Sequence, residues 1–415
     1  MEQYVIIGNG IAAAGCIEGI RSINTEAKIV VISKEKHPVY CRPLISYYLE
    51  GKTDLDKISY RDKDFYKKNN CEVIYGEVAE KIDSKNKTVI LSNGEKIEYS
   101  KLCISTGSSA FVPPIDGLET VENKFSFLTL DDALSLEKAL TKNSKVLIIG
   151  AGLIGLKCAE GIKESVKSVT VCDLAENVLS SILDEESAPF VKEHLERKGL
   201  NLLLGDSAIK FSGNTAIMKS GKTVDFDVLV TAVGVRANTG LAESIGAKVN
   251  RGIVVNENQK TSISGIYAAG DCTESFDITQ NTHRVLALLP NAYIGGFTAG
   301  VNMLGGKRMF DNAIPMNSIG FFGLHIMTAG SYFPEKDGGA VSTVKTEKGF
   351  KKFFVKDNKL VGYILVGDIE KGGIYTDLIR KQTPLDTLDF DLIKEHPTFT
   401  AFSEKIRKEK FGGVV

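Results

Sequence analysis

Two glycine-rich turns, each framed by an apolar strand and a helix, constrain the fold of this chain more than any other feature. They share one spacing and are formed by Gly8, Gly10 and Ala13 in YVIIGNGIAAAGCIEGI, and by Gly150, Gly152 and Gly155 in KVLIIGAGLIGLKCAEGI. Such glycines let backbone N–H groups approach a pyrophosphate, whose charge faces the positive end of the following helix. One copy alone is weak evidence, but two complete copies predict two dinucleotide-binding modules.

An acidic residue follows each turn at the distance that ribose binding requires. Glu35 stands 22 residues after Ala13, and Asp173 stands 18 residues after Gly155, in each case near the end of an apolar run. A carboxylate at this place can accept hydrogen bonds from ribose hydroxyls. Asp173 is followed by LAENV, which offers no Arg or Lys to a 2′-phosphate. The second module is therefore predicted to prefer NADH to NADPH.

Length and charge are those of an ordinary globular protein. The 415 residues suffice for two or three domains, and the net charge of −1 gives no sign of a nucleic-acid or membrane partner. Val285–Gly306 and Asn312–Pro334 lack Asp, Glu, Lys and Arg, yet both contain proline, asparagine and glycine. We interpret them as buried core rather than membrane spans. No signal peptide precedes the first strand, so a cytoplasmic protein is expected.

The cysteines give no sign of a metal site or a dithiol. Seven of them are scattered at positions 16, 41, 71, 103, 158, 172 and 272. No pair has C-x-x-C spacing, and no cluster has the spacing of a zinc or iron–sulfur site. A scattered, odd-numbered set favours a reducing, cytosolic setting. We therefore predict that the chain holds neither a metal nor a dithiol of its own.

Further motifs follow the first turn in a fixed order, namely Arg42-Pro43-Leu44 with Ser46, YSKLCISTGSSAFVPPIDG, the second turn, LVTAVGVRANT, TSISGIYAAGDC and LLPNAYIGGFTAGVNMLGG. Together they resemble the FAD-dependent pyridine-nucleotide oxidoreductases of the two-Rossmann-domain type, over roughly the first three quarters of the chain. The nearest resemblance is to NADH:rubredoxin reductases, ferredoxin reductases of oxygenase systems and the flavoprotein part of nitrite reductase.

The resemblance implies an α/β fold with two Rossmann-like domains, one for FAD and one for NAD, and a C-terminal α+β interface domain. The expected FAD domain has two parts, 1–112 and 238–311, with the NAD domain at 113–237 and the C-terminal domain at 312–415. In the last domain, IPMNSIGFFGLHIMTAGSYF predicts apolar strands, GFKKFFVKDNKLVGYILVGD a hairpin with an Asp-Asn turn, and the remainder short helices. The charged tail SEKIRKEKFGGVV is interpreted as a solvated end, with docking to an acidic protein as the alternative.

The same resemblance assigns residues to the cofactors. Asp271 would bind the ribityl chain of FAD, and a helix that begins near Asn291-Ala292 would point at the flavin ring. The other predicted cofactor contacts are Gly8, Gly10, Ile11, Ala12, Ala13, Glu35, Arg42, Pro43, Ser46, Val78, Thr106, Gly107, Gly150, Gly152, Ile154, Gly155, Asp173 and Gly234.

Several residues depart from the patterns of this family. Cys41, in HPVYCRPLISYYLEGK, fits neither the C-x-x-x-x-C pair nor the single-cysteine motif, whose thiol would align with Pro43. We interpret Cys41 as a small, buried hydrophobic residue, with a redox role as the alternative. His325, inside an apolar run, is predicted to be a core histidine. His396-Pro397-Thr398 is interpreted as the start of a helix, because Ala401 replaces the acid of the histidine motif in dithiol enzymes.

Lys157 is a further departure. In the ferredoxin-reductase branch a lysine pairs with a glutamate beside the flavin, and the matching positions here are Tyr47 and Lys157. In one interpretation Lys157 points to solvent from the second Rossmann helix. In the other, Lys157 tunes the flavin by placing positive charge near the ring.

The resemblance implies an enzyme that passes electrons from NADH through FAD to a small electron-carrier protein such as rubredoxin or ferredoxin. One alternative is an NADH oxidase or peroxidase that uses oxygen or peroxide. Another is a flavin-bound redox sensor or an assembly subunit of a larger oxidoreductase. A homodimer and the reverse physiological direction stay open.

Overall fold

The computed structural model describes residues 2–332, 338–347, 349–404 and 407–408. The chain divides into two compact units. The first unit consists of Met1–Glu176, Leu200–Phe276 and Thr282–Ala313, and the second consists of Asn177–Gly199, Asp277–Asn281 and Ile314–Val415. The two units are described in turn.

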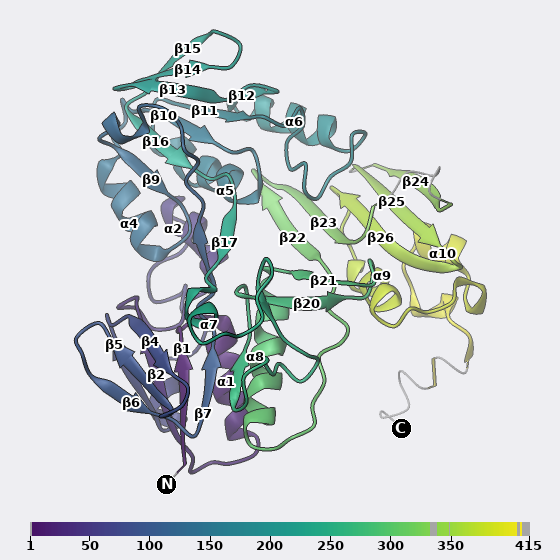
Figure 1. Ribbon diagram of the computed structural model, residues 1–415. Helices are drawn as coiled ribbons and strands as arrows, with labels where there is room; N and C mark the ends of the chain where they lie inside the picture. The colour runs from purple at the N-terminus through teal and green to yellow at the C-terminus, as the bar shows by residue number, and fades with distance from the viewer. Residues whose placement is uncertain (1, 333–337, 348, 405–406, 409–415) are drawn as a thin grey trace. The chain divides into compact units, whose positions relative to one another are not determined.

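The first module of unit 1 is a parallel sheet of order β19-β7-β1-β2-β3. Its strands are β1 (Gln3–Ile7), β2 (Lys28–Ser33), β3 (Cys71–Tyr75), β7 (Lys101–Ile104) and β19 (Ile266–Ala268). Apolar side chains of β1 are buried on both faces, which explains its unbroken apolar sequence. Helices α1 (Ile11–Arg21) and α8 (Leu289–Met303) lie side by side (Figure 1).

The second module of unit 1 is another parallel sheet, of order β12-β11-β10-β16-β9. Its strands are β9 (Lys124–Ser126), β10 (Lys145–Ile149), β11 (Ser168–Asp173), β12 (Asn201–Leu204) and β16 (Val228–Thr231), with helices α4 (Leu130–Ala139) and α5 (Leu153–Ile162). The chain passes between the modules on β8 (Ser108–Ala110) and β17 (Val235–Ala237), which pair with each other antiparallel.

Smaller elements complete unit 1. One antiparallel sheet comprises β4 (Ala79–Asp83), β5 (Thr88–Leu91) and β6 (Lys96–Glu98). Another comprises β13 (Ala208–Ser212), β14 (Thr215–Met218) and β15 (Thr223–Asp225). A further sheet comprises β18 (Ile253–Val254), β20 (Thr273–Asp277) and β21 (Thr282–Val285). The short helices are α2 (Ile45–Leu49), α3 (Phe65–Lys68) and α7 (Gly240–Ser244).

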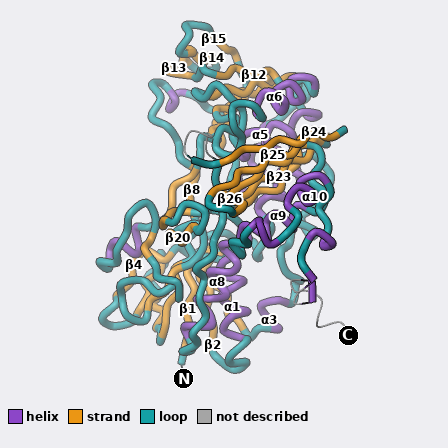
Figure 2. The backbone as a smooth tube through the Cα atoms, turned by 90° about the vertical axis from the view of Figure 1, so that its right-hand side faces the viewer, coloured by secondary structure: helices purple, strands orange, loops and turns teal. Residues whose placement is uncertain are grey.

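Unit 2 is built on an antiparallel sheet of order β22-β23-β26-β25-β24. The strands are β22 (Met316–Phe321), β23 (Leu324–Gly330), β24 (Ala340–Thr346), β25 (Gly349–Lys356) and β26 (Lys359–Val366), and the helices are α6 (Ala188–Arg197), α9 (Gly372–Arg380) and α10 (Phe390–Glu395). Helix α9 packs against β26 (Figure 2). The buried core of this unit includes Phe353, Tyr363 and Tyr375.

The predicted hairpin of the C-terminal domain is confirmed. Strands β25 and β26 are joined at Asp357 and Asn358, whose φ angles are 49° and 58°. Two successive residues with positive φ form the type I′ turn that matches the twist of a hairpin, and Asp and Asn tolerate this conformation better than most residues. The charged tail begins at Ser403, and most of it lies outside the described residues.

Three other expectations can be compared with the fold. The stretch Val285–Gly306 contains α8, and no described helix is long and apolar enough to cross a membrane. The prediction of a core histidine at position 325 is wrong, because the side chain on β23 lies on the exposed face of an alternating strand. His396 ends α10 rather than starting a helix, and Thr398 caps the 3₁₀ turn Phe399–Ala401.

Candidate active site

The first glycine-rich turn, or first phosphate turn, is predicted to bind a diphosphate. It leads directly from β1 into α1. Gly8 has a φ of +104°, and a Cβ atom there would collide with the carbonyl oxygen of Ser105, so only glycine fits. Helix α1 begins at Ile11 with Gly10 as its N-cap, and no side chain of the described chain caps this helix. The first-turn N–H groups, which include those of the predicted contacts Ala12 and Ala13, therefore face the turn as a diphosphate would require.

Glu35, the predicted ribose acid, is held by two neighbours. Its Oε1 accepts a hydrogen bond from Arg42 Nη2 at 2.9 Å, and its Oε2 accepts one from the Tyr40 hydroxyl at 2.6 Å. The Tyr40 oxygen in turn accepts the backbone N–H of Leu130 at 2.9 Å. Each carboxylate oxygen keeps a second lone pair for a ribose hydroxyl. Tyr40 is a site residue that the motifs did not reveal.

Asp271 follows β19, and its charge is coupled to that of Arg42. Burial raises the pKa of the Asp271 carboxyl, while the Arg42 guanidinium and a 3.5 Å hydrogen bond from Ser108 act in the opposite direction. Arg42 thus interacts electrostatically with both predicted acids of the FAD site, Glu35 and Asp271. The sequence predicted Glu35 from its spacing and Arg42 and Asp271 from the resemblance, and the structure places Arg42 within reach of both acids.

The other predicted FAD contacts occupy the surrounding turns. Asn291 and Ala292 are buried in the first turn of α8, which confirms the predicted helix start to within two residues. Thr106 Oγ1 donates to the carbonyl oxygen of Asn238 at 2.7 Å, and Asn238 Nδ2 donates back to the backbone carbonyl oxygen of Thr106 at 2.9 Å. Asn238 was missed, because only the pairing of β8 with β17 makes it a neighbour of Thr106 and Gly107.

Three further predicted contacts have clear local structure. Pro43 lies in the 3₁₀ turn Arg42–Leu44, and its carbonyl oxygen accepts the Ser46 hydroxyl at 3.1 Å. Ser46 is itself buried on α2. Val78 is partly exposed between β3 and β4, where its N–H donates to Ser92 Oγ at 3.0 Å. All three stay predictions as cofactor contacts.

The second phosphate turn repeats the first. Gly150 has a φ of +115°, and a Cβ atom there would collide with the carbonyl oxygen of Ala232. Gly152 is the N-cap of α5, whose first turn contains Ile154 and Gly155. Gly234, with a φ of +112°, lies where β16 leads into β17. This geometry suits a second dinucleotide diphosphate.

Asp173, the predicted ribose acid of the second module, is held by two backbone N–H groups. Its Oδ2 accepts the backbone N–H of Ala151 at 2.7 Å, and its Oδ1 accepts that of Ala175 at 2.8 Å. The carboxylate therefore joins the phosphate turn to the loop after β11 and keeps lone pairs for ribose hydroxyls. Leu174, the next residue, is 65% exposed and offers no charge to a 2′-phosphate.

Lys157 does not point into solvent. Its side chain is 11% exposed, it forms an ion pair with Glu160, and its Nζ lies 4.3 Å from the centroid of the Tyr47 ring. The solvent-facing interpretation is therefore wrong. Its burial is compatible with the second interpretation, in which the ammonium acts near a flavin.

Cys41 has the properties of an unreactive thiol. It is partly buried before the 3₁₀ turn Arg42–Leu44, and burial raises its pKa, against a smaller opposing effect of the Leu44 backbone. A thiol with a raised pKa is a poor nucleophile at neutral pH. Among the described residues, no group of three or more His, Cys, Asp or Glu is arranged to hold a metal.

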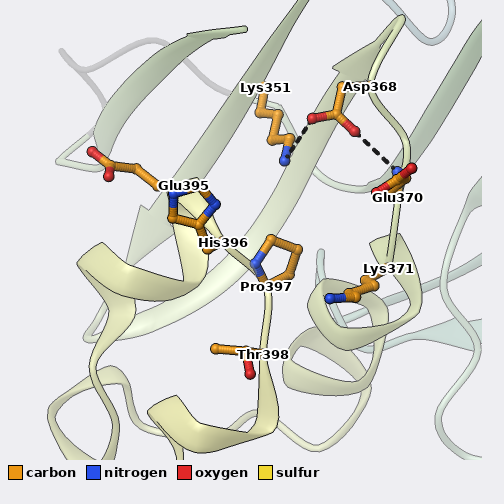
Figure 3. A pocket seen from close by; sticks show the side chains of 8 residues that line it. All are labelled: Lys351, Asp368, Glu370, Lys371, Glu395, His396, Pro397 and Thr398. Carbon is orange, nitrogen blue, oxygen red and sulfur yellow. Dashed lines mark hydrogen bonds and ion pairs between the residues drawn. The ribbon is translucent and has the colours of Figure 1, made fainter.

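Unit 2 contains a small polar pocket around His396 (Figure 3). Lys351 reaches into it from β25 and forms an ion pair with Asp368 at 3.0 Å, and Asp368 also accepts the backbone N–H of Glu370 at 3.2 Å. The charges of Lys351 and Asp368 thus neutralise each other within the wall of the pocket. We interpret this pocket as part of the packing of unit 2.

Comparison with known proteins decides the family. Residues 2–295 match the family model described as pyridine nucleotide-disulphide oxidoreductase. The chain belongs to this family. Its members use FAD and NAD(H), which agrees with the cofactor pair and the two Rossmann-like domains that the sequence predicted. Residues 315–383 of this family member match a second model, the rubredoxin NAD⁺ reductase C-terminal domain.

Curated relatives carry several different names. The chain is 31% identical to the assimilatory nitrate reductase electron transfer subunit of Bacillus subtilis, over 95% of this chain and 51% of that protein. It is 29% identical to the NADH-dependent phenylglyoxylate dehydrogenase subunit epsilon of Aromatoleum evansii, over 93% of both chains. It is 32% identical to an NADH oxidase of Methanocaldococcus jannaschii, over 88% and 87%. The chain thus spans about half the length of the first of these relatives.

Solved structures share the complete fold. The NAD-dependent persulfide reductase from A. fulgidus has a TM-score of 0.84 at 28% identity, covering 93% of this chain and 78% of that chain. The NADH:rubredoxin oxidoreductase from Clostridium acetobutylicum has a TM-score of 0.75 at 27% identity, covering 92% and 96%. These similarities confirm the predicted fold class of two Rossmann-like domains with a C-terminal domain.

Proposed function

We propose that this chain takes a hydride from NADH onto bound FAD and passes the electrons to a small carrier protein such as rubredoxin or ferredoxin. The observation that carries the proposal is that both phosphate turns belong to one compact unit, connected through the pair β8–β17. Hydride transfer requires the two reacting rings to meet at close range, and one folded unit can hold both dinucleotides in that arrangement. FAD, when bound, accepts a hydride and can release its electrons singly, which suits a one-electron carrier.

The chain's own residues supply binding and charge in this proposal. Glu35 and Asp173 accept hydrogen bonds from the ribose hydroxyls of FAD and NADH, and Asp271 accepts them from the ribityl chain. Arg42 keeps Glu35 in place, at 2.9 Å, and offsets the charge of Asp271. The first turn of α8, at Asn291, presents N–H groups that favour negative charge on a reduced flavin.

The second compact unit supports a small electron carrier as the acceptor. Its residues 315–383 match the C-terminal domain of rubredoxin reductases, and the NADH:rubredoxin oxidoreductase of C. acetobutylicum has the same fold. A second candidate is an electron-transfer subunit of a larger oxidoreductase. The names of the B. subtilis and A. evansii relatives favour this candidate. An NADH oxidase is the third, by similarity to the M. jannaschii protein.

Anaerobic stopped-flow spectroscopy of the purified full chain tests the proposal. We expect a yellow protein that NADH bleaches and that rubredoxin or ferredoxin reoxidises faster than oxygen does. A protein that is colourless and cannot be reconstituted with FAD would overturn the proposal. Bleaching with dye turnover, but without reoxidation by either carrier, would favour the subunit candidate. Fastest reoxidation by oxygen would favour the oxidase.

A further inference from the structure

Helices α2 and α5 join the two dinucleotide-binding modules. Helix α2 directly follows the 3₁₀ turn that carries Arg42, and α5 begins at the second phosphate turn. The helices lie in close contact, because a Cβ atom added at Gly161 would lie 2.8 Å from the carbonyl oxygen of Ser46. Side chains at this contact therefore lie between the predicted FAD site and the predicted NAD site.

A cation and an aromatic ring meet across this contact. Lys157 of α5 places its Nζ 4.3 Å from the centroid of the Tyr47 ring of α2. At that distance the ammonium is attracted by the negative face of the ring, more strongly where water is excluded. The pair thus fixes the position of one positive charge between the modules.

The charge of Lys157 is buried together with that of Glu160. The two residues form an (i, i+3) ion pair on α5, and their side chains are 11% and 5% exposed. Burying an ion pair contributes little net stability, because the loss of hydration offsets the mutual attraction of the charges. Apolar side chains of similar volume would serve the packing of α2 on α5 equally well. A requirement for charge at this place explains the pair better than packing does.

Lys52 provides a contrast on the same ring. Its Nζ lies 5.9 Å from the Tyr47 centroid and pairs with Glu50, but its side chain is 55% exposed. Water and salt screen such a charge. Of these two lysines, Lys157 alone is shielded enough to exert a strong field at short range.

We propose that Lys157, Glu160 and Tyr47 form a charge-setting unit for the flavin, in which Glu160 is a positioning residue. Tyr47 and Glu160 hold the Lys157 ammonium at the contact between the modules, and the Glu160 carboxylate offsets part of its charge. A positive charge near the ring makes the flavin easier to reduce, and a negative charge makes it harder. This inference rests on the proposed function, because it requires bound FAD.

The test measures the flavin midpoint potential of three full-chain variants by anaerobic redox titration. Lys157→Met removes the positive charge and should lower the potential. Glu160→Gln removes the negative charge and should raise it. The double variant should return toward the wild-type value. Each single change should alter the ratio of reduced to oxidised flavin about tenfold, which is ~30 mV for a two-electron couple.

Two further variants serve as controls. Lys157→Arg keeps the charge and should stay near the wild-type potential. Lys52→Met removes the exposed lysine over the same ring and should leave the potential unchanged. If Lys157→Met or Glu160→Gln does not fold, comparison of Lys157→Arg with Lys157→Gln measures the same charge.

The outcomes separate the inference from the proposed function. Opposite shifts for Lys157→Met and Glu160→Gln support the charge-setting unit, since a purely structural ion pair would lower stability in both variants without moving the potential in opposite directions. A yellow protein that NADH bleaches, but whose single variants shift in the same direction or not at all, overturns this inference alone. A protein that never binds FAD overturns both.

Discussion

Lys352 and Asp184, 168 residues apart in the chain, form an ion pair inside unit 2. Lys352 also contacts Glu186 at 2.6 Å, and the rings of Phe190 and Phe350 meet edge to face at 5.8 Å. These contacts join the segment 177–199 to the sheet of the C-terminal domain. The segment directly follows the strand and loop that carry Asp173, so the C-terminal unit includes part of the expected NAD domain.

Two consecutive residues of β25, Lys351 and Lys352, point to opposite faces of this sheet. Successive residues of a strand point to opposite sides, and Lys351 contacts Asp368 while Lys352 contacts Asp184. Both lysines are buried, with side chains 3% and 8% exposed. The sheet is therefore fixed by a charged contact on each side, with α6 and α9 belonging to different faces.

Replacing Lys352 with Met should destabilise the full chain by ~1.5–3 kcal/mol at pH 7, the usual value for hydrogen bonds to charged groups. Burial tends to raise the pKa of Asp184, but hydrogen bonds from Lys352 and Ser187 outweigh it and lower the pKa. A carboxyl with a lowered folded-state pKa stabilises the protein above its unfolded pKa, near 4, and this contribution is lost as the pH falls. The difference between wild type and variant should therefore shrink below about pH 4.

Urea unfolding followed by circular dichroism at pH 7 and at lower pH measures this difference. Lys192→Met is the matched control, because Lys192 and Glu196 form a surface pair with both side chains about two-fifths exposed. Its effect should stay within ~0.5 kcal/mol. An equal loss of unfolding free energy in both variants would show that the Lys352 ion pair contributes no more than a surface ion pair does.

Replacing Asp271 with Ala should weaken FAD binding by about 10–100-fold, the equivalent of losing one or two hydrogen bonds to a charged group. The reason is that Asp271 is the predicted acceptor for the ribityl chain. Titration of the apoprotein with FAD, followed by flavin fluorescence, gives the affinity. Asp56→Ala, at a residue with an exposed side chain, is the control and should bind FAD as the wild type does. Unchanged affinity in Asp271→Ala would remove this residue from the site.

Replacing Leu174 with Arg should improve the use of NADPH at least tenfold, as judged by kcat/KM with a dye acceptor. Leu174 is 65% exposed beside Asp173, so a guanidinium there has room to meet a 2′-phosphate. The wild type should prefer NADH. Leu174→Met, which adds no charge, should gain no activity with NADPH. Equal use of both nucleotides by the wild type would contradict the assignment of Asp173.

Replacing Cys41 with Ser should preserve most of the rate of flavin reoxidation. Burial raises the pKa of the Cys41 thiol, so little thiolate is present at neutral pH to act as a nucleophile. Stopped-flow reoxidation of the NADH-reduced protein measures the rate. Loss of most of the rate, with FAD still bound, would give Cys41 a redox role after all.

The local features of this protein were determined by its sequence. Both phosphate turns, the strands before them and the helices after them lie where the glycine spacing predicts, because glycine alone tolerates the positive φ of Gly8 and Gly150. The Asp357-Asn358 hairpin is equally local, since two residues set the turn and alternation sets the strands. The spacing after the first turn also located Glu35, and family motifs located Arg42 and Asp271; in the structure Arg42 interacts with both acids.

Contacts between distant segments were decided by the tertiary structure alone. Sequence periodicity could not say whether Lys157 faces water, because its burial depends on α2, more than a hundred residues earlier. The prediction that His325 lies in the core was wrong for a related reason, since only the pairing of β23 in its sheet determines which face is exposed. The contact of Lys352 with Asp184 has no signature in either segment. Glycine spacing and alternation act over a few residues, whereas the burial and pairing of charges depend on which segments the whole fold brings together.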